Sequence, residues 1–262
     1  MIRVELLSDL IRDVLISGKI KNEAPLSLIL LAPPEHGKSE LLSQFSKNPS
    51  VSWCNDLSSN PLITDILPDV EKKIITHIVI PDFLKILTHS KRTTQSLLTL
   101  LNSLTAEGIK DINFYGVERH FDYPIKAGVV MAMTREALER RKVYWKDIGF
   151  LARCIPVSYR YSDLTIRQVH DWIKLGDYSR GNYVHLPRRI RDVDIKPKFS
   201  KKVDTLQASW REKVQSFTGF RLHKQFRTWL KAIAYRDEEV NSDHLLKLTE
   251  YLKYINFDYN VI

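Results

Sequence analysis

The stretch "LSLILLAPPEHGKSELL", residues 26–42, decides the fold. Its first part, 26–32, is a nearly continuous apolar run, which is typical of a strand buried on both faces of a sheet. The run "KSELLSQFSK", residues 38–47, predicts a helix. A buried strand that leads through a short loop into a helix is the repeating unit of α/β proteins, so we expect a mostly parallel sheet with helices on both faces.

The same alternation continues along the chain. Four more strands are predicted, at 51–55, 76–82, 127–134 and 154–161. Helices are predicted at 62–74, where Pro68 should break the helix, and at 93–108, 135–149 and 165–176. The segment 111–118 predicts a short strand or one arm of a hairpin. Residues 1–176 are therefore expected to form a three-layer αβα domain.

A change of pattern after residue 176 indicates a second part of the chain. Residues 177–204 are rich in basic side chains and lack periodicity, which favours a linker or a surface loop. From 205 to 262 the pattern is helical, and Ser242 or Asp243 is expected to cap the last helix. We therefore expect a small helical domain after the α/β domain.

The composition limits the class of protein. The 262 residues carry a net charge of +9 and are 44% hydrophobic, which is enough for one large core. Two cysteines without a CxxC pair or Cys/His cluster argue against a zinc site or a disulfide framework. The first ten residues do not read as a secretory signal, and the longest apolar run is too short to cross a bilayer. We expect a soluble, cytoplasmic protein with no membrane partner.

The loop between the first strand and its helix matches a phosphate-binding pattern. The pattern G-x-x-x-x-G-K-[ST] aligns with Ala32, Pro33, Pro34, Glu35, His36, Gly37, Lys38 and Ser39. In such a loop backbone N–H groups bind phosphates, the lysine reaches the β and γ phosphates, and the hydroxyl reaches Mg²⁺. Prolines have no N–H group, so the donors must come from the later half of the loop. We predict a site for ATP and Mg²⁺; the alternative is a chance match at a strand–helix turn.

Two residues of this loop depart from the pattern. Ala32 replaces the first glycine, and Glu35 stands where the backbone often needs a glycine-like conformation. Because a carboxylate repels phosphates, we expect the Glu35 side chain to point outward and nucleotide binding to be weaker. These departures bear on the efficiency of hydrolysis more than on the fold.

A carboxylate at the end of a neighbouring strand usually completes such a site, by holding Mg²⁺ or by orienting the attacking water. The predicted strand 76–82 ends in Asp82, which lies between Pro81 and Phe83. Asp82 is therefore a single acid that takes one of the two roles, and the sequence leaves open which one. The alternative is that Asp82 only caps the helix that follows.

Taken together, these segments resemble the AAA+ ATPase family. "APPEHGKS" is similar to that family's Walker A loop, "IVIPDF" to its Walker B strand, and "VVMAMT" to its sensor 1 strand. "GFLARCIPVSY" is similar to the segment that carries the arginine finger, and "TGFRLHKQFRTWLKAIA" to the lid helix that carries sensor 2. The resemblance implies Asp82, Thr134 and Arg153 as catalytic residues, and it implies Arg221 near the phosphates of its own subunit.

The resemblance also implies a P-loop NTPase fold with a helical lid, and self-assembly into a ring or filament. Arg153 would then act on the nucleotide of a neighbouring subunit, and Arg160 or Arg135 would be the next candidates for that role. The residues alone leave two alternatives open: Arg153 caps a helix C-terminus, and Arg221 forms a surface salt bridge.

Two basic segments suggest a nucleic-acid partner. Residues 134–146 predict a basic helix with interleaved aromatics, and 186–202 predict a basic loop. Tyr144, Trp145 or Tyr183 could stack on bases while the cations contact phosphates. The alternative is a solvated face and a surface linker.

The function expected from the sequence is therefore an ATPase, with weak turnover, that remodels or loads nucleic acid as an oligomer and works with a protein partner. Two alternatives use the same residues. One is a nucleotide-gated assembly switch, and the other is a protein-remodelling chaperone that resembles MoxR-type ATPases.

Overall fold

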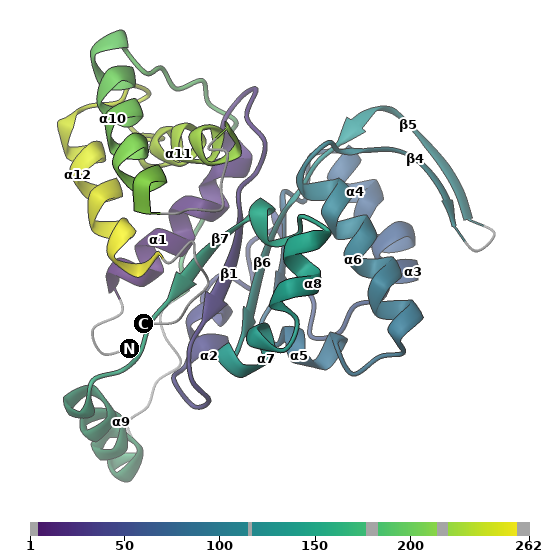
Figure 1. Cartoon of the computed structure of the whole chain (residues 1–262), viewed down its shortest axis with the longest axis horizontal. Helices are drawn as coiled ribbons and strands as arrows, with labels where there is room; N and C mark the ends of the chain where they lie inside the picture. The colour runs from purple at the N-terminus through teal and green to yellow at the C-terminus, as the bar shows by residue number, and fades with distance from the viewer. Residues whose placement is uncertain (1–4, 115–116, 177–182, 214–219, 256–262) are drawn as a thin grey trace.

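The centre of the structure is a five-stranded parallel sheet with strand order β2-β3-β6-β1-β7 (Figure 1). The computed structural model describes residues 5–114, 117–176, 183–213 and 220–255. The strands are β1 (Ser27–Leu31), β2 (Val51–Trp53), β3 (His77–Ile80), β6 (Gly128–Met133) and β7 (Cys154–Ser158). These are the strands predicted from the apolar runs, and the predicted α/β class with a mostly parallel sheet is confirmed.

Both faces of this sheet are buried. In β1, Leu28 and Leu30 belong to one hydrophobic core, whereas Ile29 and Leu31 belong to the other. The alternation follows from the two-residue repeat of a strand. Because neither face of β1 meets water, nearly every position in the strand is apolar, which explains the continuous run in the sequence.

One face of the sheet is covered by α2 and by helices from the two ends of the chain. These helices are α1 (Glu5–Ile16), α2 (Lys38–Ser43), α10 (Pro197–Lys213), α11 (Phe220–Ile233) and α12 (Ser242–Tyr251), with 3₁₀ turns η1 (Ser17–Lys19) and η4 (Leu252–Tyr254). In Figure 1, α1, α10, α11 and α12 form the group on the left. They share one hydrophobic core with β1, β6 and β7.

This layer differs from the predicted domain division. The sequence assigned residues 1–176 to one domain and 205–262 to another, but α1 packs against α11 and α12 in a single core. The predicted linker 177–204 also overlaps α10, which already begins at Pro197. The difference arises from α1, a helix that was not predicted from the sequence. Its apolar face must be buried, and it packs against the C-terminal helices.

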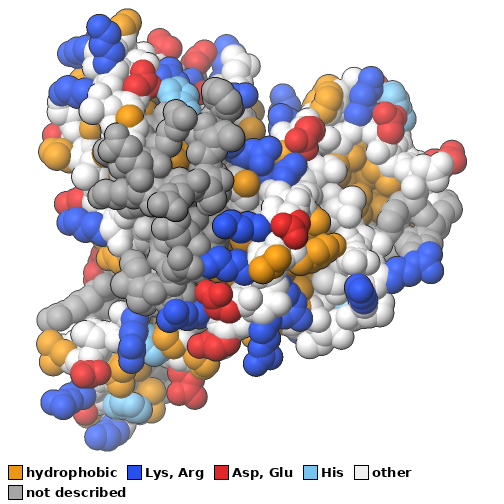
Figure 2. All heavy atoms as spheres, in the orientation of Figure 1, with side chains coloured by type: hydrophobic (Ala, Val, Ile, Leu, Met, Phe, Trp, Pro, Cys, Tyr) orange, Lys and Arg blue, Asp and Glu red, His pale blue; other side chains and the backbone are white. Residues whose placement is uncertain are grey.

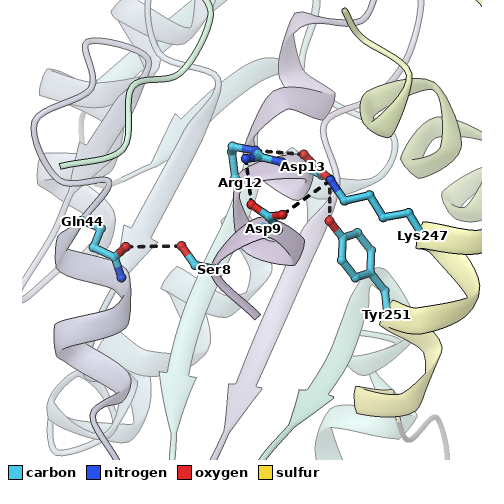
Figure 3. Close-up of polar contacts among 7 residues, drawn as sticks. All are labelled: Ser8, Asp9, Arg12, Asp13, Gln44, Lys247 and Tyr251. Atoms are coloured by element: carbon cyan, nitrogen blue, oxygen red, sulfur yellow. Dashed lines mark hydrogen bonds and ion pairs between the residues drawn. The ribbon is translucent and has the colours of Figure 1, made fainter. Parts of the chain in front are cut away.

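A buried ionic network joins α1 to α12 (Figure 3). Asp13 is only 2% exposed, and its carboxylate accepts a 2.6 Å hydrogen bond from the Tyr251 hydroxyl. Lys247 lies 3.0 Å from the same carboxylate, and Arg12 lies 3.2 Å from it. Burial, and then the charge of Asp13, raise the pKa of Tyr251. The network satisfies a buried carboxylate and thereby fixes the N-terminal helix on the C-terminal one.

The opposite face is covered by helices from the middle of the chain. They are α3 (Ser59–Pro61), η2 (Leu62–Ile66), α4 (Leu67–Glu71), α5 (Phe83–Ile86), α6 (Lys91–Thr105), α7 (Arg135–Glu139), α8 (Lys142–Asp147) and the 3₁₀ turn η3 (Leu151–Arg153). An antiparallel hairpin, β4 (Ile109–Phe114) and β5 (Val117–Ile125), extends from this side, as the hairpin prediction for 111–118 anticipated (Figure 1).

Several predicted helices differ in detail. Pro68 does not break its helix, because it lies in the first turn of α4, where a missing N–H costs little, after the π-helical turn η2. The predicted helix 135–149 is divided into α7 and α8 near Arg141. Asn241, rather than Ser242 or Asp243, caps α12 and accepts from the His244 backbone N–H.

Candidate nucleotide site

The predicted site residues follow the carboxyl ends of β1, β3 and β6. The loop 32–37 leaves β1, Asp82 follows β3, and Thr134 follows β6. Because β6 pairs with β1 on one side and with β3 on the other, the three strand ends lie next to one another. The Ser39 hydroxyl donates to the Pro81 carbonyl at 3.4 Å, so the loop and the end of β3 are in direct contact.

Lys38 is folded back on its own loop. Its ammonium donates to the carbonyls of Ala32 at 2.9 Å and Pro33 at 2.7 Å. Burial lowers the pKa of Lys38, and the nearby carboxylates of Asp82 and Glu136 oppose that shift. A cation held by neutral carbonyls in a partly buried site can exchange these partners for an anion.

Two carboxylates therefore act on Lys38, not one. Asp82 caps α5 by accepting from the Leu84 backbone N–H at 3.1 Å, which is the alternative role that the sequence left open. Glu136 lies in the first turn of α7, two residues after Thr134, and its charge also reaches Lys38. The sequence analysis looked for a second acid directly beside Asp82 and therefore missed Glu136. The fold instead supplies the second acid from α7, which follows the neighbouring strand β6.

Thr134 also has a structural role. Its hydroxyl accepts from the Ala137 backbone N–H at 3.4 Å and caps α7. This cap fixes the first turn of α7, and with it the position of Glu136 over the end of β6.

The backbone of the loop explains its two unusual residues. Glu35 has φ +61° and Gly37 has φ +69°, so both adopt the left-handed conformation. Glu35 is exposed, as expected, and its backbone takes the glycine-like conformation that the pattern predicts for this position. A residue with a side chain adopts this conformation at a cost of about 1 kcal/mol.

Two tyrosines that follow β7 pack on the loop, and sequence reasoning did not single them out. The Tyr159 hydroxyl donates to the His36 carbonyl at 2.6 Å, and the Tyr161 ring stacks on the His36 ring with centroids 5.2 Å apart. A Cβ atom added to Gly37 would lie 2.7 Å from the Tyr161 hydroxyl oxygen. Burial raises the pKa of both tyrosines, which keeps their hydroxyls as hydrogen-bond donors. Position 37 therefore favours glycine, because its φ is positive and the Tyr161 ring approaches it closely.

The two arginines are not near this site. Arg153 precedes β7, at the amino edge of the sheet, and its Nη1 donates at 2.6 Å to the carbonyl of Gly149, just beyond α8. This contact is the capping role that the sequence left open for Arg153. Arg221 lies beside Arg153, so its predicted place near the phosphates of its own subunit is wrong. The helix predicted to be the lid, α11, packs over the amino ends of the strands, whereas the loop follows the carboxyl end of β1.

The structure also constrains the predicted nucleic-acid contacts. Trp145 is 1% exposed and packs edge-on against Phe150, so it does not stack on bases, contrary to the prediction. Tyr144 remains exposed, and Tyr183 packs against His185. The predicted basic loop 186–202 is helical from Pro197, and its remaining part, 186–196, is held by three ion pairs, which are Lys21–Asp192, Arg191–Glu238 and Lys196–Glu239. Two of these pairs, those of Arg191 and Lys196, neutralise cations of the segment.

The donor set fits a magnesium ion bound together with phosphates. Mg²⁺ prefers oxygen ligands and is commonly held by one or two carboxylates, a hydroxyl, water and substrate phosphates. Ser39, Asp82 and Glu136 supply oxygens of these kinds at the same edge of the sheet. Groups of three or more His, Cys, Asp or Glu side chains able to hold a metal alone are absent from the described residues, so phosphates would have to supply part of the shell.

No protein-family model matches the sequence, and a search of curated proteins finds no match. Among the described residues, no helix is both long and apolar enough to span a bilayer.

Proposed function

We propose that this protein is a nucleoside triphosphatase of the AAA+ type, with ATP bound at the loop 32–39. The observation that carries the proposal is the meeting of Lys38, Ser39, Asp82 and Glu136 at the carboxyl edge of the sheet. In open α/β sheets, ligands bind outside the carboxyl ends of the strands. The loop enters there in the left-handed conformation that directs backbone N–H groups at an anion.

The residues can share the work of hydrolysis. Lys38 would leave the carbonyls of Ala32 and Pro33 and bind phosphate oxygens, which neutralises charge that develops as the terminal phosphoryl group departs. Ser39 and Asp82 would hold Mg²⁺, whose chemistry is to withdraw charge from phosphate oxygens. Glu136 would accept a hydrogen bond from the attacking water. On this proposal Asp82 takes the metal role and Glu136 takes the water-orienting role.

Binding and chemistry need separate tests. Wild-type protein should bind ATP with Mg²⁺ in a calorimetric titration, and Lys38→Ala should lose that binding. Lys47→Ala is a matched control, because Lys47 is an exposed lysine close behind the same helix. Normal ATP affinity in Lys38→Ala would refute the loop assignment.

A second candidate function is a nucleotide-gated assembly switch with little turnover. The strained and charged Glu35 in the loop favours it, because both features weaken a phosphate site. Multiple-turnover phosphate release, measured with the oligomeric state by light scattering, separates the two functions. ATP-dependent assembly without phosphate release would identify the switch.

We propose nucleic acid as the substrate of this ATPase, with a protein partner for the assembly. The net charge of +9 and the exposed Tyr144 support nucleic acid, although Trp145 and the docked loop reduce the available surface. The expected result is binding of single- or double-stranded DNA whose affinity falls steeply with added salt. A protein-remodelling chaperone of the MoxR type predicts no such affinity.

A further inference from the structure

A second basic pocket lies at the edge of the sheet opposite to the loop. It has a volume of about 280 Å³ and is bounded by the amino ends of β1, β6 and β7, the end of α6, and α11. Four of its lining side chains are cationic and one is anionic: Lys126, Arg153, Arg221 and Lys224, against Glu107. Figure 2 shows Lys and Arg side chains gathered across the middle of the molecule, around an acidic one.

The positive charges in this pocket are only partly neutralised by nearby carboxylates. Burial, and then the like charge of Arg153, lower the pKa of Arg221. Glu107 lies 3.4 Å from Arg153, but its side chain is 69% exposed and it is a single charge. Arg221, Lys126 and Lys224 form no salt bridge with another described residue. Clustered cations with this little neutralisation attract an anion.

The geometry around Arg153 is fixed before any ligand arrives. Its Nη1 is held by the Gly149 carbonyl at 2.6 Å, and its backbone carbonyl accepts from the Gln225 amide on α11 at 3.2 Å. A Cβ atom added to Gly149, which has φ +70°, would lie 2.7 Å from that same Nη1. The Nε atom is buried and has no hydrogen-bond partner among the described residues. One donor of this guanidinium is therefore unsatisfied, which leaves the charge of Arg153 only partly compensated.

We propose that this pocket is a second phosphate-binding site, independent of the loop, that takes a compact phosphate oligoanion such as the triphosphate tail of a nucleotide. Guanidinium groups bind phosphate through paired N–H donors, and the two lysines add point charges. The pocket is open to solvent, and its volume of about 280 Å³ suits a short phosphate chain rather than the extended backbone of a nucleic acid. The pocket cannot serve the nucleotide of its own loop, because β1 alone separates the two edges by roughly 13 Å.

The test of binding uses a protein whose loop is disabled. Lys38→Ala protein is titrated with sodium tripolyphosphate at low salt, and the double variant Lys38→Ala/Arg221→Gln is titrated in parallel. We expect binding in the first and a loss of about tenfold or more in the second. Lys38→Ala/Arg236→Gln is the matched control, because Arg236 is an exposed arginine just beyond α11.

Two results would overturn the proposal. One is equal affinity in the Arg221 and Arg236 variants, which would mean a diffuse basic surface. The other is single-stranded DNA that competes with tripolyphosphate far more tightly than its charge predicts and depends on Arg221, which would make the pocket a nucleic-acid site. Neither measurement needs ATP binding or turnover, so failure here and failure of the proposed function are distinguishable.

A further experiment distinguishes two sources of the bound phosphate. The first is a nucleotide free in solution, and the second is a nucleotide bound to the loop of a second copy of the chain. Lys38→Ala and Arg221→Gln proteins are mixed and phosphate release is measured. If the pocket serves the loop of another copy, the mixture regains turnover that neither variant has alone. If Arg221→Gln protein, whose own loop is intact, releases phosphate like wild type on its own although it has lost tripolyphosphate binding, the phosphate comes from solution.

Discussion

His77 should make the stability of this protein depend on pH in a defined way. The residue is fully buried at the start of β3, where Gly128 and Gly18 leave no room for it to move. Its Nε2 lies 3.1 Å from the Leu26 carbonyl, which can only accept, so Nε2 carries the proton. Its Nδ1 then accepts from the Thr76 hydroxyl at 3.1 Å. The ring is therefore held in its neutral form.

Burial lowers the pKa of His77 from 6.5 to about 3, and the positive charge of Lys19 acts in the same direction. Below pH 6.5 His77 is protonated in the unfolded chain but stays neutral in the folded chain. The free energy of unfolding therefore falls as the pH falls toward 3. Between pH 7.5 and pH 5 this linkage removes about 2 kcal/mol from the free energy of unfolding. The loss is complete only below pH 3.

The assay is urea unfolding at pH 7.5 and pH 5, monitored by circular dichroism. Wild type is compared with His77→Gln, which keeps an amide donor for the Leu26 carbonyl but does not titrate. The difference in unfolding free energy between the two proteins should change by about 2 kcal/mol across this range. His170→Gln, on the exposed surface of α9 (Asp163–Leu175), should give a change below about 0.5 kcal/mol. The reasoning would be refuted if the difference in unfolding free energy between wild type and His77→Gln were the same at pH 7.5 and pH 5.

Three further substitutions test the site and the packing. Glu35→Gly relieves a left-handed residue and removes a charge from the loop, so the free energy of unfolding should rise by about 1 kcal/mol and ATP should bind roughly two- to fivefold more tightly. Glu136→Gln should lower phosphate release by about 100-fold or more, with ATP affinity within about threefold of wild type. Tyr251→Phe removes the hydroxyl that donates to Asp13 and should lower the free energy of unfolding by about 1.5–3 kcal/mol in urea titrations.

Each of these substitutions has a matched control. Lys73→Gly relieves an equivalent left-handed residue, with φ +58°, away from the loop, and should stabilise without changing ATP affinity. Glu139→Gln removes an exposed carboxylate from the other end of α7 and should leave phosphate release unchanged. Tyr254→Phe removes a hydroxyl that forms no hydrogen bond among the described residues. The corresponding assignment would be contradicted if Lys73→Gly matched Glu35→Gly in ATP affinity, if Glu139→Gln matched Glu136→Gln in phosphate release, or if Tyr254→Phe matched Tyr251→Phe in unfolding free energy.

The sheet was predictable because a strand buried on both faces leaves a local signature. The apolar run 26–32 and the later ones mark β1 and its neighbours directly, and the backbone of Glu35 follows from the loop pattern. The helical layer was less predictable. α1 lies at the other end of the sequence, and only its contacts with α11 and α12 show that it belongs with the C-terminal helices.

The candidate site illustrates the same limit. The meeting of Lys38, Ser39 and Asp82 at one edge of the sheet could be predicted because loop spacing and strand ends are local properties. Glu136 was missed because its proximity to Lys38 depends on β6 lying between β1 and β3. The order of strands in a sheet cannot be predicted from any single segment of sequence. Arg221 was misplaced for a similar reason, since the side of the sheet that a helix covers is decided by packing.

The union of α1 with the C-terminal helices has a consequence for biosynthesis. A ribosome releases α1 first and α12 last, so the layer over β1, β6 and β7 cannot be completed until the whole chain has emerged. Until then, Leu28, Val130 and Val157 expose an apolar surface that invites aggregation. A fragment that stops at residue 176 should therefore be insoluble on its own, and adding residues 197–255 as a separate polypeptide should rescue it.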